Sequence, residues 1–448
     1  MTLRFGTDGV RGPAHELTDE LVTALGRAAA TILGGEQFVV GRDPRESGPR
    51  LEAALVAGLG ASGTAVEVLG LVPTPVVAWI CADREVAGAM ISASHNAFAD
   101  NGIKFFAPGG LKLTDAVEAR LEAELDRVLA EGAPPLPDGS GRPGAGGVLD
   151  PATDVGRYGQ AVMASIEGRR LDGLRVVIDC ANGAASSIAP DLLTDLGAEV
   201  VVLHAQPDGR NINAGCGSTY PASLQEAVVA NGAHIGLAFD GDADRVLAVD
   251  ESGELIDGDH LIALCALDMR ERGTLVGDTV VVTVMTNLGF RLAMVDHGIH
   301  VVETQVGDRY VLEALEAGGF SLGGEQSGHV IFRRLATTGD GVLTGVQLLD
   351  LLARARQPLS ALAAAAMTRL PQVLINVPVA ARSARLLDDL APEIAAVEAE
   401  LGDQGRVLVR PSGTEPLVRV MVEAADEGRA RAAAERLVGA VGRLAPPA

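Results

Sequence analysis

The chain has 448 residues, of which 48% are hydrophobic, and its formal net charge is −23 at pH 7. At roughly 100–200 residues per domain, this length predicts about three or four domains. A strongly negative surface repels polyanions, so neither nucleic acid nor an anionic membrane is an expected partner. No apolar stretch reaches the ~18 residues of a membrane span, and the N-terminus lacks a signal-peptide core, which predicts a cytoplasmic protein.

Two scarce residue types add to this description. Lys104 and Lys112 are the only lysines among the 36 basic residues, so the places of these two in the fold are of interest. The cysteines are far apart and form no C-x-x-C pair, which argues against a disulfide framework and against a structural zinc site. The four are Cys81, Cys180, Cys216 and Cys265.

A succession of three apolar runs occurs three times along the chain. Each copy begins with a run that ends in a polar or glycine turn, continues through a helix-length segment to a second run, and closes with a third run. The runs cover residues 36–48, 63–70 and 86–92, then 174–185, 197–205 and 234–239, then 278–289, 298–307 and 319–324. Such runs are typical of buried parallel strands in βαβ units. They predict three related mixed α/β domains.

Residues 369–448 show a different pattern. Strand-like runs and helical segments alternate there, at 373–379, about 383–401, 406–410, 416–424 and about 427–443. The closely spaced second and third strands predict an antiparallel hairpin within a small α+β domain. A Pro/Gly-rich stretch at 132–147 separates the first domain from the second. The expected domains are therefore 1–150, 151–252, 253–368 and 369–448.

The third run of each copy leads into an unusual loop, and ligands of open α/β sheets gather at such strand ends. The first loop, ISASHNAFADNGIKFF at 91–106, offers Ser92 on the strand edge and Ser94 on the turn beside His95. A serine that accepts or carries a group needs a rigid support with its hydroxyl exposed, which a strand end provides. An ordinary polar turn is the alternative.

The second loop, FDGDADRVLAVD at 239–250, places Asp240, Asp242 and Asp244 at alternate positions, followed by Arg245. Carboxylates this close repel each other unless a cation is bound, and all-oxygen ligands suit Mg²⁺, Ca²⁺ or Mn²⁺. An EF-hand is excluded because arginine occupies the position that requires glycine and because the flanks have strand patterns. A solvated acidic turn is the alternative.

The remaining loops offer groups for a phosphorylated ligand. In GGEQSGH at 323–329, Glu325, Ser327 and His329 can bind hydroxyls or an amine, although a plain hairpin turn fits as well. The loop RPSGTEP at 410–416 combines cations, hydroxyls and a glycine that permits an anion-binding nest. Its candidate phosphate ligands are Arg410, Ser412, Gly413 and Thr414, with Arg419 following. A Pro/Gly turn is again the alternative. Near the N-terminus, FGTDGVRG contributes Arg11, either as a further cation of the site or as part of a turn.

Together, the motifs SASHN, DGDADR, GEQSGH and RPSGTEP resemble, in order, the four signatures of the α-D-phosphohexomutase superfamily. The resemblance extends over essentially the whole chain. It implies three related α/β domains around a cleft and a fourth, C-terminal domain with a TATA-binding-protein-like fold. The start FGTDGVRG, the glutamine of GEQSGH and the sequence GDRY at 307–310 resemble the branch that acts on glucosamine phosphates. Ala97 and Ala99 depart from the proline and the aromatic residue that are common at these positions of the serine loop.

The resemblance also implies roles for the candidate residues. Ser94 carries a covalent phosphate, and one Mg²⁺ is bound by this serine with Asp240, Asp242 and Asp244. Lys104 matches a position associated with acid–base work, and His95, Arg11 and Arg245 are further candidates for acid, base and charge stabilisation. Sugar contacts fall to Glu325, Ser327 and His329, and phosphate contacts to Arg410, Ser412, Gly413, Thr414 and Arg419.

The expected reaction is the interconversion of glucosamine 6-phosphate and glucosamine 1-phosphate through a phosphoserine and a bisphosphorylated sugar. The same chemistry on mannose or glucose phosphates is the alternative within the superfamily. A phosphatase, or a non-catalytic protein that binds ligands through a divalent metal, is the alternative from another class. A hexosamine phosphate is the expected partner, and the chain is expected to be a monomer or homodimer.

Overall fold

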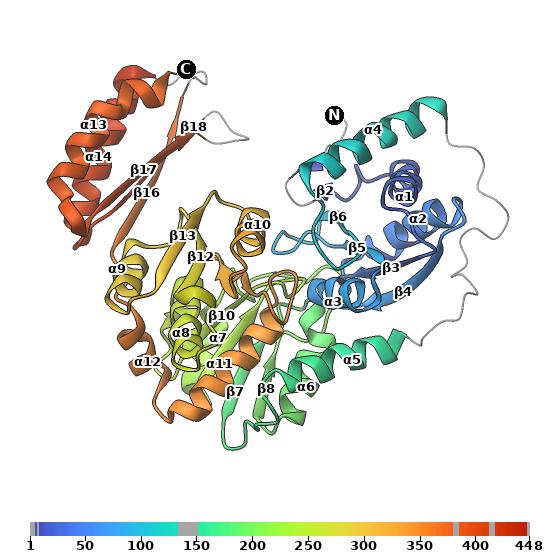
Figure 1. Ribbon diagram of the computed structural model, residues 1–448, viewed down its shortest axis with the longest axis horizontal. Coiled ribbons are helices and arrows are strands. Elements are labelled where there is room, and N and C mark those ends of the chain that lie inside the picture. The colour runs from blue at the N-terminus through green and yellow to red at the C-terminus, as the bar shows by residue number, and fades with distance from the viewer. Residues whose placement is uncertain (1–4, 7–8, 133–150, 380–384, 412–416, 446–448) are drawn as a thin grey trace. The chain divides into compact units, whose positions relative to one another are not determined.

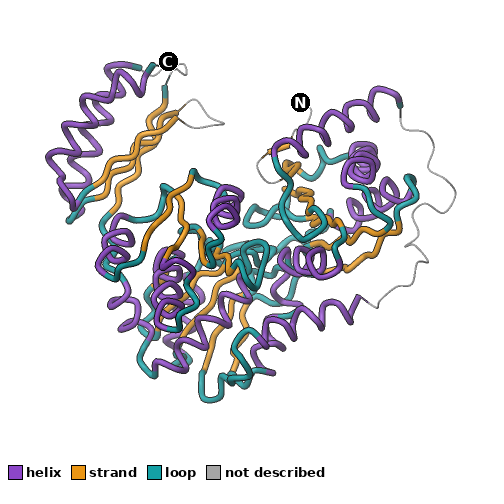
Figure 2. The backbone as a smooth tube through the Cα atoms, in the orientation of Figure 1, coloured by secondary structure: helices purple, strands orange, loops and turns teal. Residues whose placement is uncertain are grey.

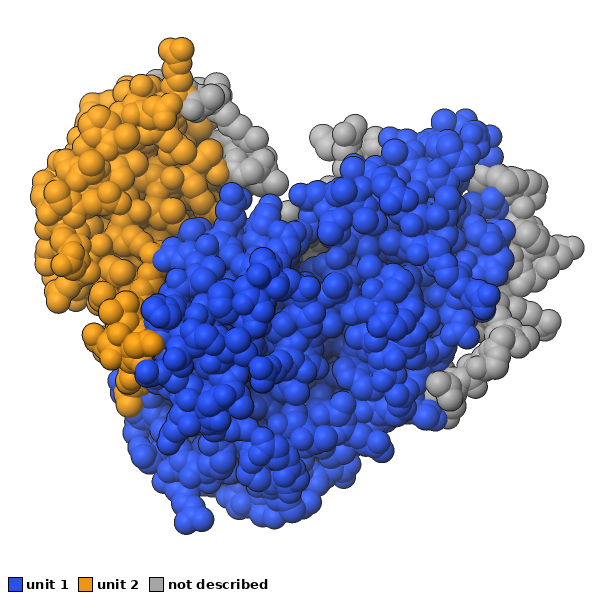
Figure 3. All heavy atoms as spheres, in the orientation of Figure 1, with its two compact units in different colours: residues 1–284, 299–364 blue, residues 285–298, 365–448 orange. Residues whose placement is uncertain are grey.

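The computed structural model describes residues 5–6, 9–132, 151–379, 385–411 and 417–445. They form two compact units, shown in different colours in Figure 3. The first contains residues 1–284 and 299–364, and the second contains residues 285–298 and 365–448. No helix in the described parts of the chain is long and apolar enough to cross a membrane.

The first unit contains three mixed sheets, which Figure 2 shows as separate groups of strands. The first sheet has the order β1(Phe5–Gly6), β2(Gly9–Pro13), β6(Asp100–Phe106), β5(Ala87–Ile91), β3(Gln37–Arg42), β4(Ala65–Leu71). The second has the order β11(Leu255–Ile256), β10(Val246–Asp250), β9(Ile235–Phe239), β7(Arg175–Asp179), β8(Glu199–Leu203). The third has the order β13(His300–Thr304), β12(Thr279–Thr283), β14(Leu322–Gly324), β15(Val330–Phe332).

The three sheets share one topology, which confirms the predicted repeat. In each, the first strand of a copy lies between the second and the third and is parallel to both. A fourth strand then returns antiparallel to the third, as β6, β10 or β15. The loop that joins the third strand to this returning strand is the chemistry-bearing loop in all three copies. The repeat therefore places the serine, aspartate and GEQSGH loops at equivalent ends of their sheets.

Helices of the first unit surround these sheets (Figure 1). They are α1(Asp19–Leu33), α2(Gly48–Gly60), α3(Thr74–Arg84), α4(Asp115–Glu131), α5(Pro151–Ala164), α6(Ala189–Asp195), α7(Ala222–Ala230), α8(Gly258–Glu271), α10(Asp308–Gly318), α11(Gly341–Ala355) and α12(Leu359–Ala366), the last of which continues into the second unit. Helix α11 contacts α5, β9, α8 and β15, so it connects elements of the second and third sheets. Its N-cap, Asp340, accepts hydrogen bonds from Leu343 N at 2.9 Å and from the buried Tyr158 hydroxyl.

The second unit has one antiparallel sheet in the order β16(Gln372–Pro378), β18(Leu417–Glu423), β17(Arg406–Pro411). Its helices are α9(Leu288–Asp296), α13(Leu386–Leu401) and α14(Glu427–Leu444). The fully buried Glu423 accepts from Asn287 Nδ2 at 3.1 Å, Leu288 N at 2.9 Å and Arg406 Nε at 3.1 Å, which joins α9 to the sheet. This arrangement confirms the predicted α+β fold at the C-terminus, whereas the expected domain boundaries stay a prediction.

Candidate active site

The aspartate loop is a tight connection between two fully buried antiparallel strands, β9 and β10. Asp240, Asp242 and Asp244 are each at most 3% exposed, and one carboxylate oxygen from each lies within 4.8 Å of the others. Ala243 between them has φ of +58°, a left-handed conformation that turns alternate side chains toward one point. The EF-hand alternative is therefore excluded by geometry as well as by sequence.

The clustered charges change the acidity of the loop. Burial, and then the charges of Asp244 and Asp242, raise the pKa of Asp240 well above its ordinary value. Burial acts against the ionisation of Asp244 too, but Lys104, His329 and Arg245 hold the pKa of that carboxyl well below its ordinary value. Without a bound cation, burial and repulsion therefore favour a proton on Asp240 while Asp244 stays ionised, so the three carboxyls do not share the site as free anions.

The donor set fits a hard divalent cation. Asp242 Oδ1 and Asp244 Oδ1 are buried and accept no hydrogen bond, although burial without a partner is costly for a carboxylate. Their other oxygens are engaged, since Lys104 Nζ lies 3.0 Å from Asp242 Oδ2 and 3.5 Å from Asp244 Oδ2. Thr74 also donates to Asp242 Oδ2 at 2.6 Å. Oxygen ligands alone favour Mg²⁺ or a similar ion over zinc.

Ser94 lies against this trio, and Ser92 does not. The Ser94 hydroxyl donates to Asp240 Oδ2 at 2.6 Å, whereas the Ser92 hydroxyl donates to Asp43 Oδ2 at 2.7 Å. Ser94 has φ of +51°, which a residue other than glycine seldom adopts without support from its surroundings. Ser92 Oγ supplies part of that support by accepting from Ser94 N at 2.9 Å.

A buried arginine holds the backbone of the serine loop. The guanidinium of Arg45 is fully buried and pairs with Asp43, with Nε 2.8 Å from Oδ2. Its remaining N–H groups donate to four carbonyl oxygens, those of Ser94, Asn96, Ala97 and Asp100. Asn213 Nδ2 adds a bond of 2.9 Å to the Ser94 carbonyl. The loop that lacks proline at position 97 is thus fixed by hydrogen bonds instead.

His95 and Arg245 lie beside Ser94. Burial, and then the charges of Arg245 and Arg11, lower the pKa of His95 to about 4, so its imidazole is neutral near pH 7. Arg245 Nη1 lies 3.1 Å from His95 Nδ1, and because arginine can only donate, Nδ1 is the acceptor. Ser94 Oγ lies 3.4 Å from the same nitrogen. Arg11 is on β2, opposite Gly102 of β6, so it belongs to a strand and not to a turn.

The GEQSGH loop joins β14 to β15 and contributes three different environments. Glu325 Oε1 accepts from Gly307 N at 3.1 Å, and Ser327 Oγ is buried without a hydrogen-bond partner. His329 is buried, with Nδ1 3.7 Å from Asp244 Oδ2 and Nε2 accepting from Gly339 N at 3.0 Å. The structure thus leaves Glu325 and Ser327 able to bind a ligand and places His329 as a support of the aspartate loop.

Both lysines of the chain lie near this region. Lys104 contacts two of the aspartates, and Lys112 forms an ion pair with Asp308. Asp308 Oδ2 also lies 3.4 Å from His329 Nε2, so the second lysine is linked to the aspartate loop through that pair. The two lysines of this arginine-rich chain therefore both lie at this concentration of buried charge.

In the second unit, Arg410 of β17 is directly opposite Arg419 of β18. Like charges at opposed positions of a sheet are destabilising. Burial, and then the charge of Arg419, lower the pKa of Arg410. An anion bound to both arginines would relieve this repulsion. The other expected phosphate ligands, Ser412, Gly413 and Thr414, lie outside the described residues.

Sequence reasoning missed the residues that position the site. Asp43 and Arg45 follow β3, Thr74 begins α3, and Asn213 belongs to an irregular loop. The segment GRDPRESG at 41–48 was recognised only as a polar turn after a strand. An aspartate and an arginine two residues apart at the carboxyl end of a strand could have suggested a function for it.

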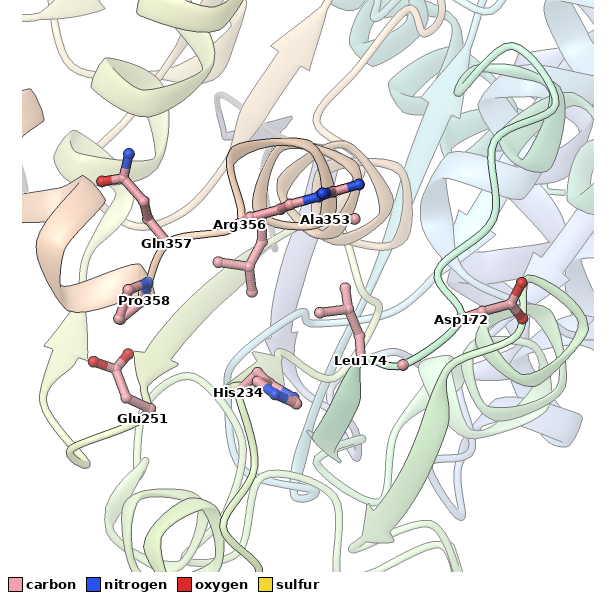
Figure 4. A pocket seen from close by; sticks show the side chains of 10 residues that line it. Asp172, Leu174, His234, Glu251, Ala353, Arg356, Gln357 and Pro358 are labelled. Atoms are coloured by element: carbon pink, nitrogen blue, oxygen red, sulfur yellow. The ribbon is translucent and has the colours of Figure 1, made fainter.

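A cavity of about 450 Å³ lies elsewhere in the first unit, beside Asp172, Leu174, His234, Glu251 and Arg356 (Figure 4). None of the candidate site residues lines it. This cavity is therefore separate from the candidate active site, where Ser94 and Asp240 contact each other directly.

Four family models match successive parts of the chain. They describe phosphoglucomutase/phosphomannomutase α/β/α domain I at residues 2–131, domain II at 157–253, domain III at 257–370 and the C-terminal domain at 374–440. Each of the four loops analysed above falls within a different one of these matches.

Relatives and solved structures agree with these matches. The chain is 53% identical over 463 residues to a phosphoglucosamine mutase of Frankia casuarinae, with 100% of both chains covered. It is 54% identical over 446 residues to that of Rhodococcus opacus, with 98% of each covered. The fold is similar to a phosphoglucomutase/phosphomannomutase family protein from Burkholderia thailandensis, with a TM-score of 0.80, 26% identity and coverage of 99% and 98%.

The buried position of Arg45 generates a stability prediction. Arg45→Met keeps most of the side-chain volume but removes the charged partner of Asp43 and one hydrogen-bond donor from each of four carbonyls. We expect a loss of about 3–5 kcal/mol in the free energy of unfolding, as for other broken buried ion pairs. Thermal unfolding measures this loss. The control Arg210→Gln removes an exposed ion pair with Glu46 and should leave the midpoint unchanged, and equal midpoints for both variants would contradict the assignment.

Proposed function

Because the chain belongs to the phosphoglucomutase/phosphomannomutase family, we propose that it interconverts glucosamine 6-phosphate and glucosamine 1-phosphate. The observation that carries the proposal is the bond of 2.6 Å between Ser94 Oγ and Asp240 within the buried aspartate trio. Relatives at 53–54% identity over nearly the full chain are phosphoglucosamine mutases, which favours glucosamine phosphate over mannose or glucose phosphate. We also propose that the protein is cytoplasmic and that it is a monomer or a homodimer.

Ser94 is proposed to carry the transferable phosphate. In the forward direction its O–P bond breaks while a sugar hydroxyl oxygen forms a new bond to phosphorus, the hydroxyl proton passes to a base, and Ser94 Oγ regains a proton. The product is a bisphosphorylated sugar. When that sugar presents its other phosphate to Ser94, the reverse transfer restores the phosphoserine. Atoms and charge therefore balance over a cycle without any external phosphate donor.

Asp240, Asp242 and Asp244 are proposed to hold one Mg²⁺, together with an oxygen of the Ser94 phosphate. When bound, Mg²⁺ supplies positive charge that stabilises the phosphoryl group during transfer. The orphaned oxygens Asp242 Oδ1 and Asp244 Oδ1 support this assignment. Lys104 lies on the same carboxylates, which supports a role in charge balance and in proton donation near Ser94.

The other residues are assigned to charge stabilisation and to substrate binding. Arg245 and Arg11 are proposed to provide fixed positive charge beside Ser94, and neutral His95, whose Nδ1 accepts from Arg245, can donate its Nε2–H to a ligand oxygen. Glu325 and Ser327 are proposed to bind the sugar, because the Ser327 hydroxyl is buried without a partner. Arg410 and Arg419 are proposed to bind the phosphate that is not being transferred, together with Ser412, Gly413 and Thr414, which follow Arg410 in the sequence. His329 is proposed to support Asp244.

Removal of the Ser94 hydroxyl tests the proposed chemistry. Ser94→Ala should lower turnover on the order of 10⁴-fold or more, as loss of a covalent nucleophile does in hydrolases. A coupled assay should show that the unmodified chain prefers glucosamine 6-phosphate to glucose 1-phosphate and mannose 1-phosphate. Intact-mass measurement should find one phosphate on the purified chain and on the control Ser92→Ala, but none on Ser94→Ala. A phosphate that persists in Ser94→Ala would refute the assignment.

The aspartate trio should trade stability for function. Asp240→Asn removes one of three mutually repelling buried charges, so the metal-free variant should unfold at a higher temperature than the metal-free parent chain. Mutation of a residue that is hydrogen-bonded to a metal ligand typically lowers metal affinity ~10–100-fold. Loss of a direct ligand such as Asp240 should weaken Mg²⁺ binding at least as much. Calorimetric titration measures the affinity. The control Asp268→Asn alters a carboxylate on α8 that pairs with Arg354, and it should leave Mg²⁺ affinity unchanged. An unchanged Mg²⁺ affinity in Asp240→Asn would contradict the assignment.

The opposed arginines of the second unit give a third test. Arg410→Gln removes a charged donor worth about 1.5–3 kcal/mol, so KM for glucosamine 6-phosphate should rise about 10- to 150-fold. Without ligand, the variant should be no less stable than the parent chain, because repulsion with Arg419 disappears. The control Arg431→Gln alters an exposed pair with Glu427 on α14 and should leave KM unchanged. An unchanged KM for Arg410→Gln would exclude this arginine from phosphate binding.

A further inference from the structure

A second group of metal-ligating side chains lies in the first unit where the parallel strands β7 and β8 end. Asp179 is the last residue of β7, His204 directly follows β8, and Cys216 belongs to the loop that leads to α7. A carboxylate oxygen, a ring nitrogen and the sulfur of these three residues all lie within 4.8 Å of one another. Asp179 and Cys216 are fully buried, whereas the His204 side chain is 32% exposed.

The three ligand atoms are only weakly engaged by the protein. His204 Nδ1 lies 3.1 Å from Asp179 Oδ2, yet it is inaccessible to solvent and is not oriented for a hydrogen bond. The Cys216 sulfur has a long contact of 3.9 Å from Asn182 Nδ2. Asp179 accepts from Ala181 N at 2.9 Å and Gly217 N at 2.8 Å, one bond to each oxygen, so each oxygen retains a lone pair. The backbone thus orients the carboxylate as it does in many metal ligands.

The spacing of these atoms suits a tetrahedral ion. Zinc bonds of roughly 2.0–2.3 Å to oxygen, nitrogen and sulfur place neighbouring ligands about 3.3–3.8 Å apart. The separation of 3.1 Å between His204 Nδ1 and Asp179 Oδ2 is close to that range, and the outer limit of 4.8 Å allows a small contraction on binding. Three protein ligands leave one position of a tetrahedral ion for a water.

We propose that Asp179, His204 and Cys216 form a second metal site, which takes a thiophilic divalent cation such as Zn²⁺ with water as the fourth ligand. Cys216 binds as the thiolate and releases its proton to solvent, while His204 binds through the lone pair of neutral Nδ1. Because thiolate and imidazole select zinc and carboxylates alone select Mg²⁺, the two sites choose different ions. Burial raises the pKa of Cys216 to about 12, so without metal the thiol stays protonated and inert.

An ion at this site would fix loops that support the candidate active site. Asn213 donates its backbone N–H to Ala181 O at 2.9 Å and its side-chain amide to Ser94 O at 2.9 Å. Ala184 N donates to Gly241 O at 2.8 Å, beside the aspartate trio. The site therefore has a structural role: it fastens the ends of β7 and β8 beneath Ser94 and Asp240 without touching substrate.

Cobalt spectroscopy tests the proposal on the full-length protein. The chain is treated with chelator, transferred into excess Mg²⁺ to fill the aspartate trio, and titrated with Co²⁺ without oxygen. We expect a thiolate-to-cobalt charge-transfer band that saturates at one equivalent, which the sulfur-free trio cannot produce. The band should disappear in Cys216→Ser and persist in Cys180→Ser, a matched control whose buried cysteine adjoins Asp179 outside the cluster. No band in the parent chain, or a band in Cys216→Ser, overturns the proposal.

A second measurement does not depend on the cysteine variants. Zn²⁺ added in the presence of Mg²⁺ should raise the thermal unfolding midpoint of the parent chain, because a ligand that binds only the folded state stabilises it. His204→Asn should abolish this increase without disturbing the loop, since asparagine tolerates the φ of +47° found at this position. An equal increase in His204→Asn would exclude the histidine as a ligand.

Discussion

The fold of the first unit depends on neighbouring groups that offset the negative charge of three carboxylates buried in one loop. Asp240, Asp242 and Asp244 cannot share this space as free anions, because their mutual repulsion is undiminished by water. Lys104 and His329 therefore approach them from other parts of the fold, Arg245 follows them in the same loop, and two of their oxygens, Asp242 Oδ1 and Asp244 Oδ1, still accept no hydrogen bond. This unrelieved repulsion is the physical reason why the loop suits a bound cation.

The same site needs a serine held in an unfavourable backbone conformation. A left-handed residue such as Ser94 persists only where its neighbours determine the conformation. Arg45 and Asn213 meet that requirement by donating to the carbonyl of Ser94, and Arg45 also binds three further carbonyls of the loop. The hydrogen bonds that make the loop rigid are buried, so removal of any one donor should lower the stability of the folded chain substantially. These hydrogen bonds, rather than a proline within the loop, keep the Ser94 hydroxyl in contact with Asp240.

Electrostatic contrast runs through the whole chain. The net charge of −23 would repel a phosphorylated sugar, so anion binding must come from local groups of cations. Arg245 and Arg11 in the first unit and the opposed pair Arg410 and Arg419 in the second are proposed to supply these groups, and the opposed pair is itself unfavourable without an anion. Unfavourable features that a ligand would correct thus mark the carboxylate loop of the first unit and the arginine pair of the second unit, each by itself.

The amino-acid sequence determined the repeated strand order, the α+β C-terminus and the residues of the four loops, because apolar periodicity and turn chemistry are local properties. It also favoured Ser94, on the turn, over Ser92, on the strand edge, and the structure places Ser94 against Asp240 and Ser92 against Asp43. The partners that hold these residues were decided by tertiary structure. Arg45 and Ser94 are 49 positions apart, and Asn213 and Ser94 are 119 apart, so no spacing rule connects them. The cluster of Asp179, His204 and Cys216 illustrates the same limit. The absence of a C-x-x-C pair argued against a structural zinc site. The ends of two parallel strands nevertheless bring three possible ligands together, and the separation of these residues in sequence carries no metal-binding pattern.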